Sequence, residues 1–308
     1  MIKGGCIDSP DDPRDYLAEN YICMGVRPES YFPAKLAPIL DQGRIQSCVA
    51  HSIATLKWYQ EYQERKSELE YSTNYIYFNR EYSEWQGKGL IARQAIDRFV
   101  KDGTVLRSFC GGNSEYPNAT IMTSVSNLKN NSEIEKIRGK KYIKCSNVDE
   151  LCEGIFQYNG ALVTFNVPSS FNSFYNKSSK NCLVQLPKDD EHIFGSHMVC
   201  AIGYDEEGIW IQNSWGKLWG YGGLCKLPYN YPFKEMWLIV DELKDWDIVE
   251  LMVGDKKALH NGEEIKLDVE PTIVNGRTLV PLRFISELLG ADVEYDNATR
   301  KIVIRKSK

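Results

Sequence analysis

Three short stretches of this sequence carry side chains that together could transfer an acyl group. Cys48 opens a helical pattern, and a thiol at a helix N-terminus lies in the positive end of the helix macrodipole, which favours the nucleophilic thiolate. His197 begins a predicted strand, where its imidazole can accept and return a proton. Asn213 lies near the end of the next predicted strand, so it can come level with His197 and orient its ring. These residue types predict nucleophilic catalysis by Cys48, with His197 as general base and acid.

Hydrophobic periodicity indicates the elements that must position these side chains. Apolar residues at the helical repeat predict helices at 48–70, 89–101 and 148–158. Short β-branched runs predict strands at 161–167, 197–204 and 208–215. A helical half followed by a strand-rich half indicates an α+β fold of two lobes with an active-site cleft between them.

The segment 41–48 (DQGRIQSC), His197 and the run 213–216 (NSWG) resemble the active-site motifs of papain-like cysteine peptidases. Residues 72–80 (STNYIYFNR) are similar to the bacterial branch of that family, and the resemblance covers roughly residues 30–240. It implies a papain-like two-lobe fold, with Cys48 as nucleophile, His197 as base and Asn213 as the residue that orients His197. It also implies that the side-chain amide of Gln42 and the backbone N–H of Cys48 stabilise the oxyanion.

The same resemblance implies four substrate-binding residues. The backbone of Gly89 would pair with the substrate, and Met198 would line the pocket for the second residue before the cut. Trp215 matches a tryptophan that shields the hydrogen bond between Asn213 and the histidine, and Trp219 continues that motif.

Two positions depart from the papain pattern around the nucleophile. Ile45 stands where the family usually has a cysteine that forms a disulfide, so that bridge must be missing. Val49 stands in place of a tryptophan, which changes the expected shape of one side of the cleft.

The C-terminal part of the chain has a different pattern. Short strands around the turns at 261–262, 275–276 and 296–297, with a helix at 282–289, predict a compact domain. The run 274–284 (VNGRTLVPLRF) and the following LGA at 289–291 resemble the copper-amine-oxidase N-terminal-like domain, which implies a non-catalytic accessory or stalk module. We therefore expect an N-terminal arm at 1–33, a catalytic domain at 34–240 and an accessory domain at 248–308.

Composition limits the class of partner. The net charge of −5 and the pI near 5.6 argue against nucleic acid, which requires a concentrated basic face. No apolar run approaches the ~18–20 residues of a membrane span, and the N-terminus as written contains no signal peptide. The expected partner is a peptide or protein substrate, with cell-wall association through the C-terminal domain. That domain suggests a secreted or cell-surface protein, and otherwise a cytoplasmic one.

Cysteine spacing argues against a metal site. The chain has nine cysteines and no Cys-x-x-Cys pair, so we expect no structural metal and no cofactor. Most of these thiols are expected to be small buried groups in a reducing setting.

The N-terminal arm is the one segment with an expected regulatory role. Papain-like peptidases are generally made as zymogens, and the arm at 1–33 is long enough to reach the cleft. We expect it to hold the enzyme latent with Cys6 taking part: if Cys6 comes within disulfide reach of Cys48, the nucleophile is capped until it is reduced. The alternative is an arm that is disordered, or packed on the outer surface, with an incidental thiol.

The leading hypothesis is an endopeptidase that acts through a thioester acyl-enzyme. Acyl transfer to an amine at the same site remains an alternative. A second alternative is a non-catalytic cell-envelope binding or structural protein with a degenerate peptidase fold.

Overall fold

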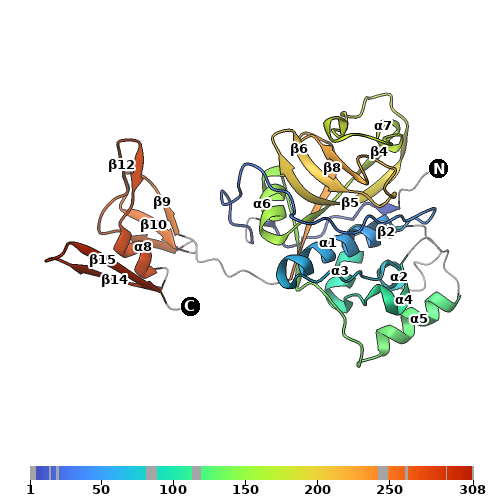
Figure 1. Cartoon of the computed structure of the whole chain (residues 1–308), viewed down its shortest axis with the longest axis horizontal. Coiled ribbons are helices and arrows are strands. Elements are labelled where there is room, and N and C mark those ends of the chain that lie inside the picture. The colour runs from blue at the N-terminus through green and yellow to red at the C-terminus, as the bar shows by residue number, and fades with distance from the viewer. Residues whose placement is uncertain are drawn as a thin grey trace. The chain divides into compact units, whose positions relative to one another are not determined.

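The computed structural model describes residues 5–13, 15–18, 21–80, 89–112, 119–241, 249–260, 263–288 and 290–306. The chain divides into two compact units, residues 1–243 and residues 244–308. In the first unit, helices α1 to α5 gather on one side and the strands β4, β5, β6 and β8 lie on the other (Figure 1).

The helices of the first unit are α1 (Cys48–Arg65), α2 (Thr73–Phe78), α3 (Ala92–Asp102), α4 (Arg107–Cys110), α5 (Ala119–Asn130), α6 (Val148–Tyr158), α7 (Ser169–Asn172) and the 3₁₀ turn η3 (Ser179–Asn181). Its strands are β1 (Cys6–Ile7), β2 (Leu90–Ile91), β3 (Lys141–Lys144), β4 (Ala161–Pro168), β5 (Ile193–Asp205), β6 (Gly208–Gln212), β7 (Leu224–Leu227) and β8 (Phe233–Val240). This arrangement is the α+β, two-lobe fold that the sequence predicted.

One sheet runs through the first unit in the order β2-β1-β5-β4-β8-β3, and β6 and β7 extend it from β5. Strand β1 comes from the N-terminal arm. It pairs in parallel with β2, opposite Leu90, and antiparallel with β5, opposite Ser196. The arm therefore joins a strand next to α3 to the strand that carries His197.

Helix α1 lies against one face of this sheet. Its residues from Cys48 to Glu61 are all buried, polar ones included. The hydroxyl of Ser52 donates to the carbonyl of Met198 on β5 at 2.9 Å, and the side-chain amide of Gln60 donates to the carbonyl of Ile239 on β8 at 2.6 Å. These two buried polar side chains find hydrogen-bond partners on the sheet, which offsets the cost of their burial.

Local sequence signals predicted helices α1, α3 and α6, but the boundaries of α1 and α3 differ from the prediction. Helix α6 begins after Asn147, whose side chain accepts a hydrogen bond from the backbone N–H of Glu150 at 2.9 Å. Helix α1 ends at Arg65, before the left-handed Lys66, and not at residue 70. The predicted helix at 89–101 begins only at Ala92, because residues 90–91 pair with β1 as strand β2.

The second unit contains the strands β9 (Val249–Leu251), β10 (Lys257–His260), β11 (Glu263–Lys266), β12 (Thr272–Val274), β13 (Arg277–Leu279), β14 (Ala291–Asp296) and β15 (Lys301–Lys306), with helix α8 (Leu282–Leu288). Strands β12 and β13 form a hairpin around Asn275 and Gly276, which both have positive φ, as a type I′ turn requires. The predicted turn at 261–262 lies outside the described residues. Within the residues that the structure describes, no helix has the length and apolar character needed to cross a membrane.

Candidate active site

A histidine–asparagine pair lies where the end of β6 runs beside β5. The Nε2 atom of His197 is 2.8 Å from Oδ1 of Asn213. The backbone N–H of Ser214 also donates to Oδ1, at 2.8 Å, and a backbone N–H can only donate, so the oxygen of the amide faces His197. The hydrogen of the neutral imidazole therefore sits on Nε2, which leaves Nδ1 as the basic nitrogen.

Aromatic rings enclose this pair. The indole of Trp215 lies against the His197 ring with centroids 4.7 Å apart, and Phe171 contacts both rings. Trp219 donates from Nε1 to the carbonyl of Phe171 at 3.1 Å and has no exposed surface. Trp215 thus lies where it can shield the hydrogen bond of His197, and Trp219 lies fully buried among the same aromatic rings.

Gln42 is held by the segment that follows Asn213. Its backbone N–H donates to the carbonyl of Ser214 at 2.8 Å, and the Ser214 hydroxyl donates to the Gln42 Oε1 at 2.7 Å. The Gln42 Nε2 donates to the carbonyl of Ile45 at 2.8 Å, in the turn that leads into α1. The amide donor of Gln42 therefore points toward the loop that ends at the nucleophile. Ser214 was not predicted from sequence, although its hydroxyl directly after Asn213 was a visible signal.

Cys48 begins α1 and has no exposed surface. Burial raises the pKa of its thiol to about 11, while hydrogen bonds with the backbone of Met198, Val49 and Gly5 act in the opposite direction. This corrects the sequence-based expectation of a depressed pKa. Water and hydrogen-bond donors stabilise a thiolate at a helix N-terminus. Here the loss of water raises the pKa of Cys48 by more than the hydrogen bonds lower it.

The arm supplies part of this cover. The backbone N–H of Gly5 donates to the carbonyl of Ser196 at 3.1 Å, and the Leu90 N–H donates to the carbonyl of Gly5 at 2.9 Å. A side chain at Gly5 would place its Cβ 2.3 Å from the carbonyl oxygen of Gln46, so only glycine fits at this point. The small bulk of Gly5, next to Cys6, was the sequence signal that the arm could enter a narrow groove.

The other predicted residues lie around the same strand. Gly89 has φ of +93°, and a Cβ on it would lie 2.3 Å from the Gly5 carbonyl oxygen. Met198 is fully buried on β5, on the same hydrophobic cluster as Cys6. Cys6 and Cys48 are both free thiols, and burial, followed by the charge of Cys48, raises the pKa of Cys6. The structure thus brings Gly89, Met198 and Cys6 together with the nucleophile, without a disulfide.

His51 is the other histidine near Cys48, one turn further along α1. Its Nδ1 lies 2.9 Å from the carbonyl of Ser47, which can only accept, and burial lowers the pKa of His51 to about 4. The imidazole is therefore neutral at physiological pH and its hydrogen is committed to the helix backbone, so His51 is not a competing base.

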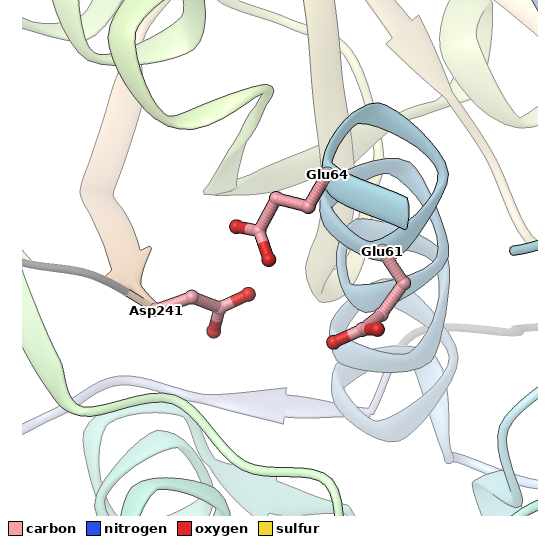
Figure 2. A group of neighbouring side chains, drawn as sticks. All are labelled: Glu61, Glu64 and Asp241. Carbon is pink, nitrogen blue, oxygen red and sulfur yellow. The ribbon is translucent and has the colours of Figure 1, made fainter. Parts of the chain in front are cut away.

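An acidic group lies at the far end of α1. Carboxylate oxygens of Glu61, Glu64 and Asp241 lie within 4.8 Å of one another (Figure 2). The ammonium of Lys57 lies 2.9 Å from Glu61 and 2.5 Å from Asp241, with 2% of its side chain exposed. Lys57 pairs with two of the three carboxylates, and a guanidinium nitrogen of Arg65 lies 3.5 Å from Glu61, so we interpret the group as an ion-pair cluster that ties α1 to the end of β8.

Two parts of this chain match known protein families. Residues 29–235 match the papain family of cysteine proteases. The chain belongs to the papain family. Residues 240–304 match the copper amine oxidase N-terminal domain. An uncharacterised peptidase C1-like protein of Acanthamoeba polyphaga mimivirus is 27% identical over 206 residues, which span 62% of this chain and 64% of that protein.

Solved structures share the fold at low sequence identity. Xylellain, a cysteine protease from Xylella fastidiosa, is 20% identical, with a TM-score of 0.61 over 78% of this chain and 96% of its own. Procathepsin B of Trypanosoma congolense is 15% identical, with a TM-score of 0.56 over 70% of this chain and 78% of its own. These likenesses support the papain-like fold of the first unit.

Proposed function

We propose that this papain-family chain is a cysteine endopeptidase that is made in a latent form, with its N-terminal arm in the path of the substrate. The observation that carries the catalytic part is the pair His197–Asn213, 2.8 Å apart, beside the helix that Cys48 opens. We assign Cys48 as nucleophile, His197 as general base and acid, Asn213 as the residue that orients the ring, and Gln42 as an oxyanion donor.

The proposed reaction uses these groups in sequence. Nδ1 of His197 takes the proton of Cys48, and the thiolate attacks the carbonyl carbon of the scissile peptide bond. The oxyanion accepts hydrogen bonds from the Gln42 side-chain amide and the Cys48 backbone N–H. His197 then protonates the leaving amine, which leaves a thioester on Cys48. Water, activated by His197, hydrolyses the thioester and releases the acid product.

The latency follows from how the arm occupies this site. Backbone hydrogen bonds hold Gly5 between Leu90 and Ser196, and Ser196 directly precedes His197 in the chain. An extended substrate would need the same backbone groups, because they line both sides of the nucleophile. We further propose that the arm contributes to the burial that raises the pKa of Cys48, so that the docked form holds little of the reactive thiolate.

Full-length protein with Gly5→Ala tests this proposal. The added Cβ would lie 2.3 Å from the Gln46 oxygen, so the arm must leave its position or shift. Overpacking of this kind costs about 1–3 kcal/mol, which would raise the undocked fraction, and the kcat/KM for a peptide, by about 5- to 150-fold. Ile7→Ala removes an exposed side chain from the same strand and should leave activity unchanged.

Two results would count against the proposal. Hydrolysis by Gly5→Ala that persists when Cys48→Ala is added would refute the catalytic assignment. Equal activity of wild type and Gly5→Ala, with the amides of Gly5 and Leu90 still protected from exchange, would leave the enzyme active with the arm in place and so refute the latency.

We also propose that residues 248–308 form a non-catalytic accessory domain, next to a catalytic domain at 34–240. The match of residues 240–304 to the copper amine oxidase N-terminal domain supports this division. A role for this domain in cell-wall association follows as a proposal, and binding of the full-length protein to purified cell walls would test it.

A further inference from the structure

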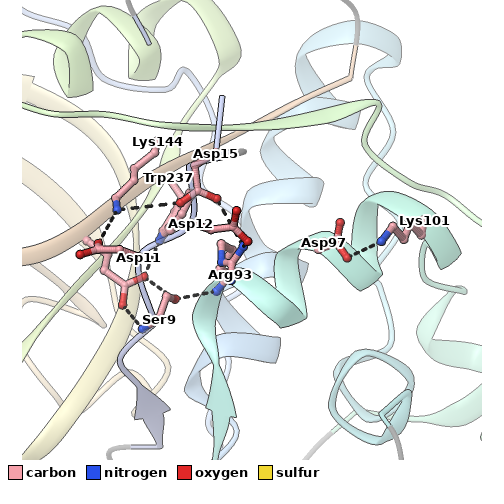
Figure 3. Close-up of polar contacts among 10 residues, drawn as sticks. Ser9, Asp11, Asp12, Asp15, Arg93, Asp97, Lys101, Lys144 and Trp237 are labelled. Carbon is pink, nitrogen blue, oxygen red and sulfur yellow. Dashed lines mark hydrogen bonds and ion pairs between the residues drawn. The ribbon is translucent and has the colours of Figure 1, made fainter. Parts of the chain in front are cut away.

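Beyond the nucleophile, the arm is held mainly by charges. We call residues 8–17 the anchor segment. Asp12 Oδ2 lies 2.5 Å from a guanidinium nitrogen of Arg93 on α3, and Asp15 Oδ1 lies 3.7 Å from the same nitrogen. The ammonium of Lys144 on β3 lies 3.6 Å from Asp11 and 3.9 Å from Asp15 (Figure 3). The anchor segment therefore binds two different elements of the catalytic unit through acidic side chains.

The Arg93 pairs are partly withdrawn from water, whereas Asp11, which pairs with Lys144, is fully exposed. The side chains of Arg93, Asp12 and Asp15 are 14%, 9% and 4% exposed. Ion pairs in such positions are stronger than exposed ones, and removal of one partner leaves the other charge without compensation.

A third cation, Lys234 on β8, pairs with Asp8 of the anchor segment. Among the described residues, every carboxylate that pairs with Arg93, Lys144 or Lys234 belongs to the arm. We call these three cations the basic track. When the arm leaves, the basic track loses all of these partners at once.

A serine docks the anchor segment at the start of α3. The Ser9 hydroxyl accepts from the backbone N–H of Arg93 at 3.0 Å and donates to a Glu235 oxygen at 2.7 Å, and the Ser9 N–H donates to the other Glu235 oxygen at 2.7 Å. The residue at the N-cap of α3, Ile91, makes no side-chain cap, so Ser9 provides it from the arm. The contacts at this position require a side chain that can both donate and accept a hydrogen bond, as a hydroxyl can.

More positive charge lies beside the anchor segment. A groove between α3 and β3 is lined by Tyr16, Arg93, Asp97, Lys101, Lys140 and Lys141. The chain as a whole has a net charge of −5, so this concentration of cations is local and does not follow from composition.

We propose that the basic track is a substrate-binding exosite that takes an acidic segment of a protein substrate once the arm has left. The inference rests on the proposed latent peptidase, and it adds the substrate class. The anchor segment defines the ligand: a hydroxyl residue followed by carboxylates three and six positions later, as in Ser9, Asp12 and Asp15. Asp12 lies six residues beyond Cys6, a span of about 20 Å in extended chain, so one substrate can occupy the nucleophile site and the basic track together.

The first test measures binding alone, in full-length protein with the arm loosened by Gly5→Ala and Asp12→Asn. The probe is a fluorescent synthetic peptide of residues 8–18, and its counterpart carries Asn at the positions of Asp11, Asp12 and Asp15. The acidic peptide should bind about 3- to 30-fold more tightly than the counterpart, and the difference should shrink as salt is added.

Matched variants locate the binding. Arg93→Gln and Lys144→Gln should each reduce the difference, whereas Lys188→Gln, the same charge change on an exposed loop elsewhere, should not. Equal binding of the two peptides would overturn the exosite. An oligonucleotide of equal charge that competes as well as the acidic peptide would also overturn it, because it would show a general polyanion surface.

The second test measures kcat/KM for peptides that share one cleavage sequence and carry either the acidic run or its Asn counterpart, placed on the N-terminal side in one set and on the C-terminal side in another. The exosite predicts that at least one acidic peptide has a lower KM and that Lys144→Gln removes the advantage. Because the first test needs no cleavage, its failure refutes the exosite, whereas absence of any hydrolysis refutes the proposed function.

Discussion

The thiol of Cys48 is subject to two opposing influences in the full-length chain. Its place at the start of α1 favours the thiolate, while complete burial raises its pKa to about 11. At pH 7.5 a thiol with that pKa is ionised in only about one molecule in 3,000.

Alkylation of Cys48 by a small uncharged reagent should therefore be slow at neutral pH and rise about tenfold per pH unit toward pH 11. In the proposed latent form the arm contributes to this burial, so its displacement by Gly5→Ala should move the same rate profile to lower pH. Mass spectrometry of the alkylated peptide across a pH series measures this. Profiles that coincide in both proteins would show that the arm does not control the ionisation of Cys48.

The residues around Cys48 should contribute unequally to catalysis. In the Gly5→Ala background, Gln42→Ala should reduce kcat by about 10²–10³, the usual effect of losing one oxyanion donor. Asn213→Ala should reduce it less than His197→Ala, because Asn213 only orients the ring through the 2.8 Å hydrogen bond. Steady-state kinetics with a short peptide gives the order, and a folded Asn213→Ala that is the more damaged of the two would contradict the assigned roles.

At the level of elements, β1 is the strand that joins both sides of the site. Next to it, the Gly5 N–H donates to the Ser196 carbonyl and the Leu90 N–H donates to the Gly5 carbonyl. Both should exchange slowly with solvent in the wild-type protein and faster in Gly5→Ala, whereas the core strand β4 should be unaffected. Hydrogen exchange measured by NMR checks this without any assay of activity, and Ile7→Ala is the matched control.

Sequence patterns were sufficient for elements whose signals are local. Helix α6 has its own N-cap in Asn147, and the hairpin at Asn275-Gly276 has its own turn residues. The start of α1 at Cys48, the strand that carries His197 and the strand that ends directly before Asn213 also followed from short runs of sequence, although β5 begins earlier than predicted, at Ile193. The residues of the candidate site could therefore be predicted from sequence motifs.

Features that depend on contacts between distant segments of the chain could not be predicted from local sequence patterns. Strands β1 and β2 have two residues each and no periodicity, and they exist because they pair with each other. The pKa of Cys48 depends on burial to which the arm contributes, so the local rule for a helix N-terminus gave the wrong direction. The buried polar residues of α1 depend on partners on β5 and β8 in the same way.

At the level of the whole molecule, the two compact units predict that the first can fold without the second. A chain that ends at Asp247, in the Gly5→Ala background, should be soluble and should hydrolyse short peptides within about twofold of the full-length rate. A chain that ends at Val240 lacks Asp241 and leaves Lys57 short of one buried partner, so its Tm should be lower. Aggregation of the longer truncation would show that the second unit is part of the catalytic core.

In the proposed latent form, the arm is covalently part of the chain that it blocks. A tethered segment competes with substrates at an effective concentration of about millimolar, whatever the concentration of the protein. Dilution therefore cannot activate the intact molecule, and micromolar substrate cannot displace the arm. One cut in the chain after the anchor segment would convert this competition into an ordinary bimolecular equilibrium, which dilution does shift. The activity of the cut protein should then rise on dilution, while that of the intact protein stays constant.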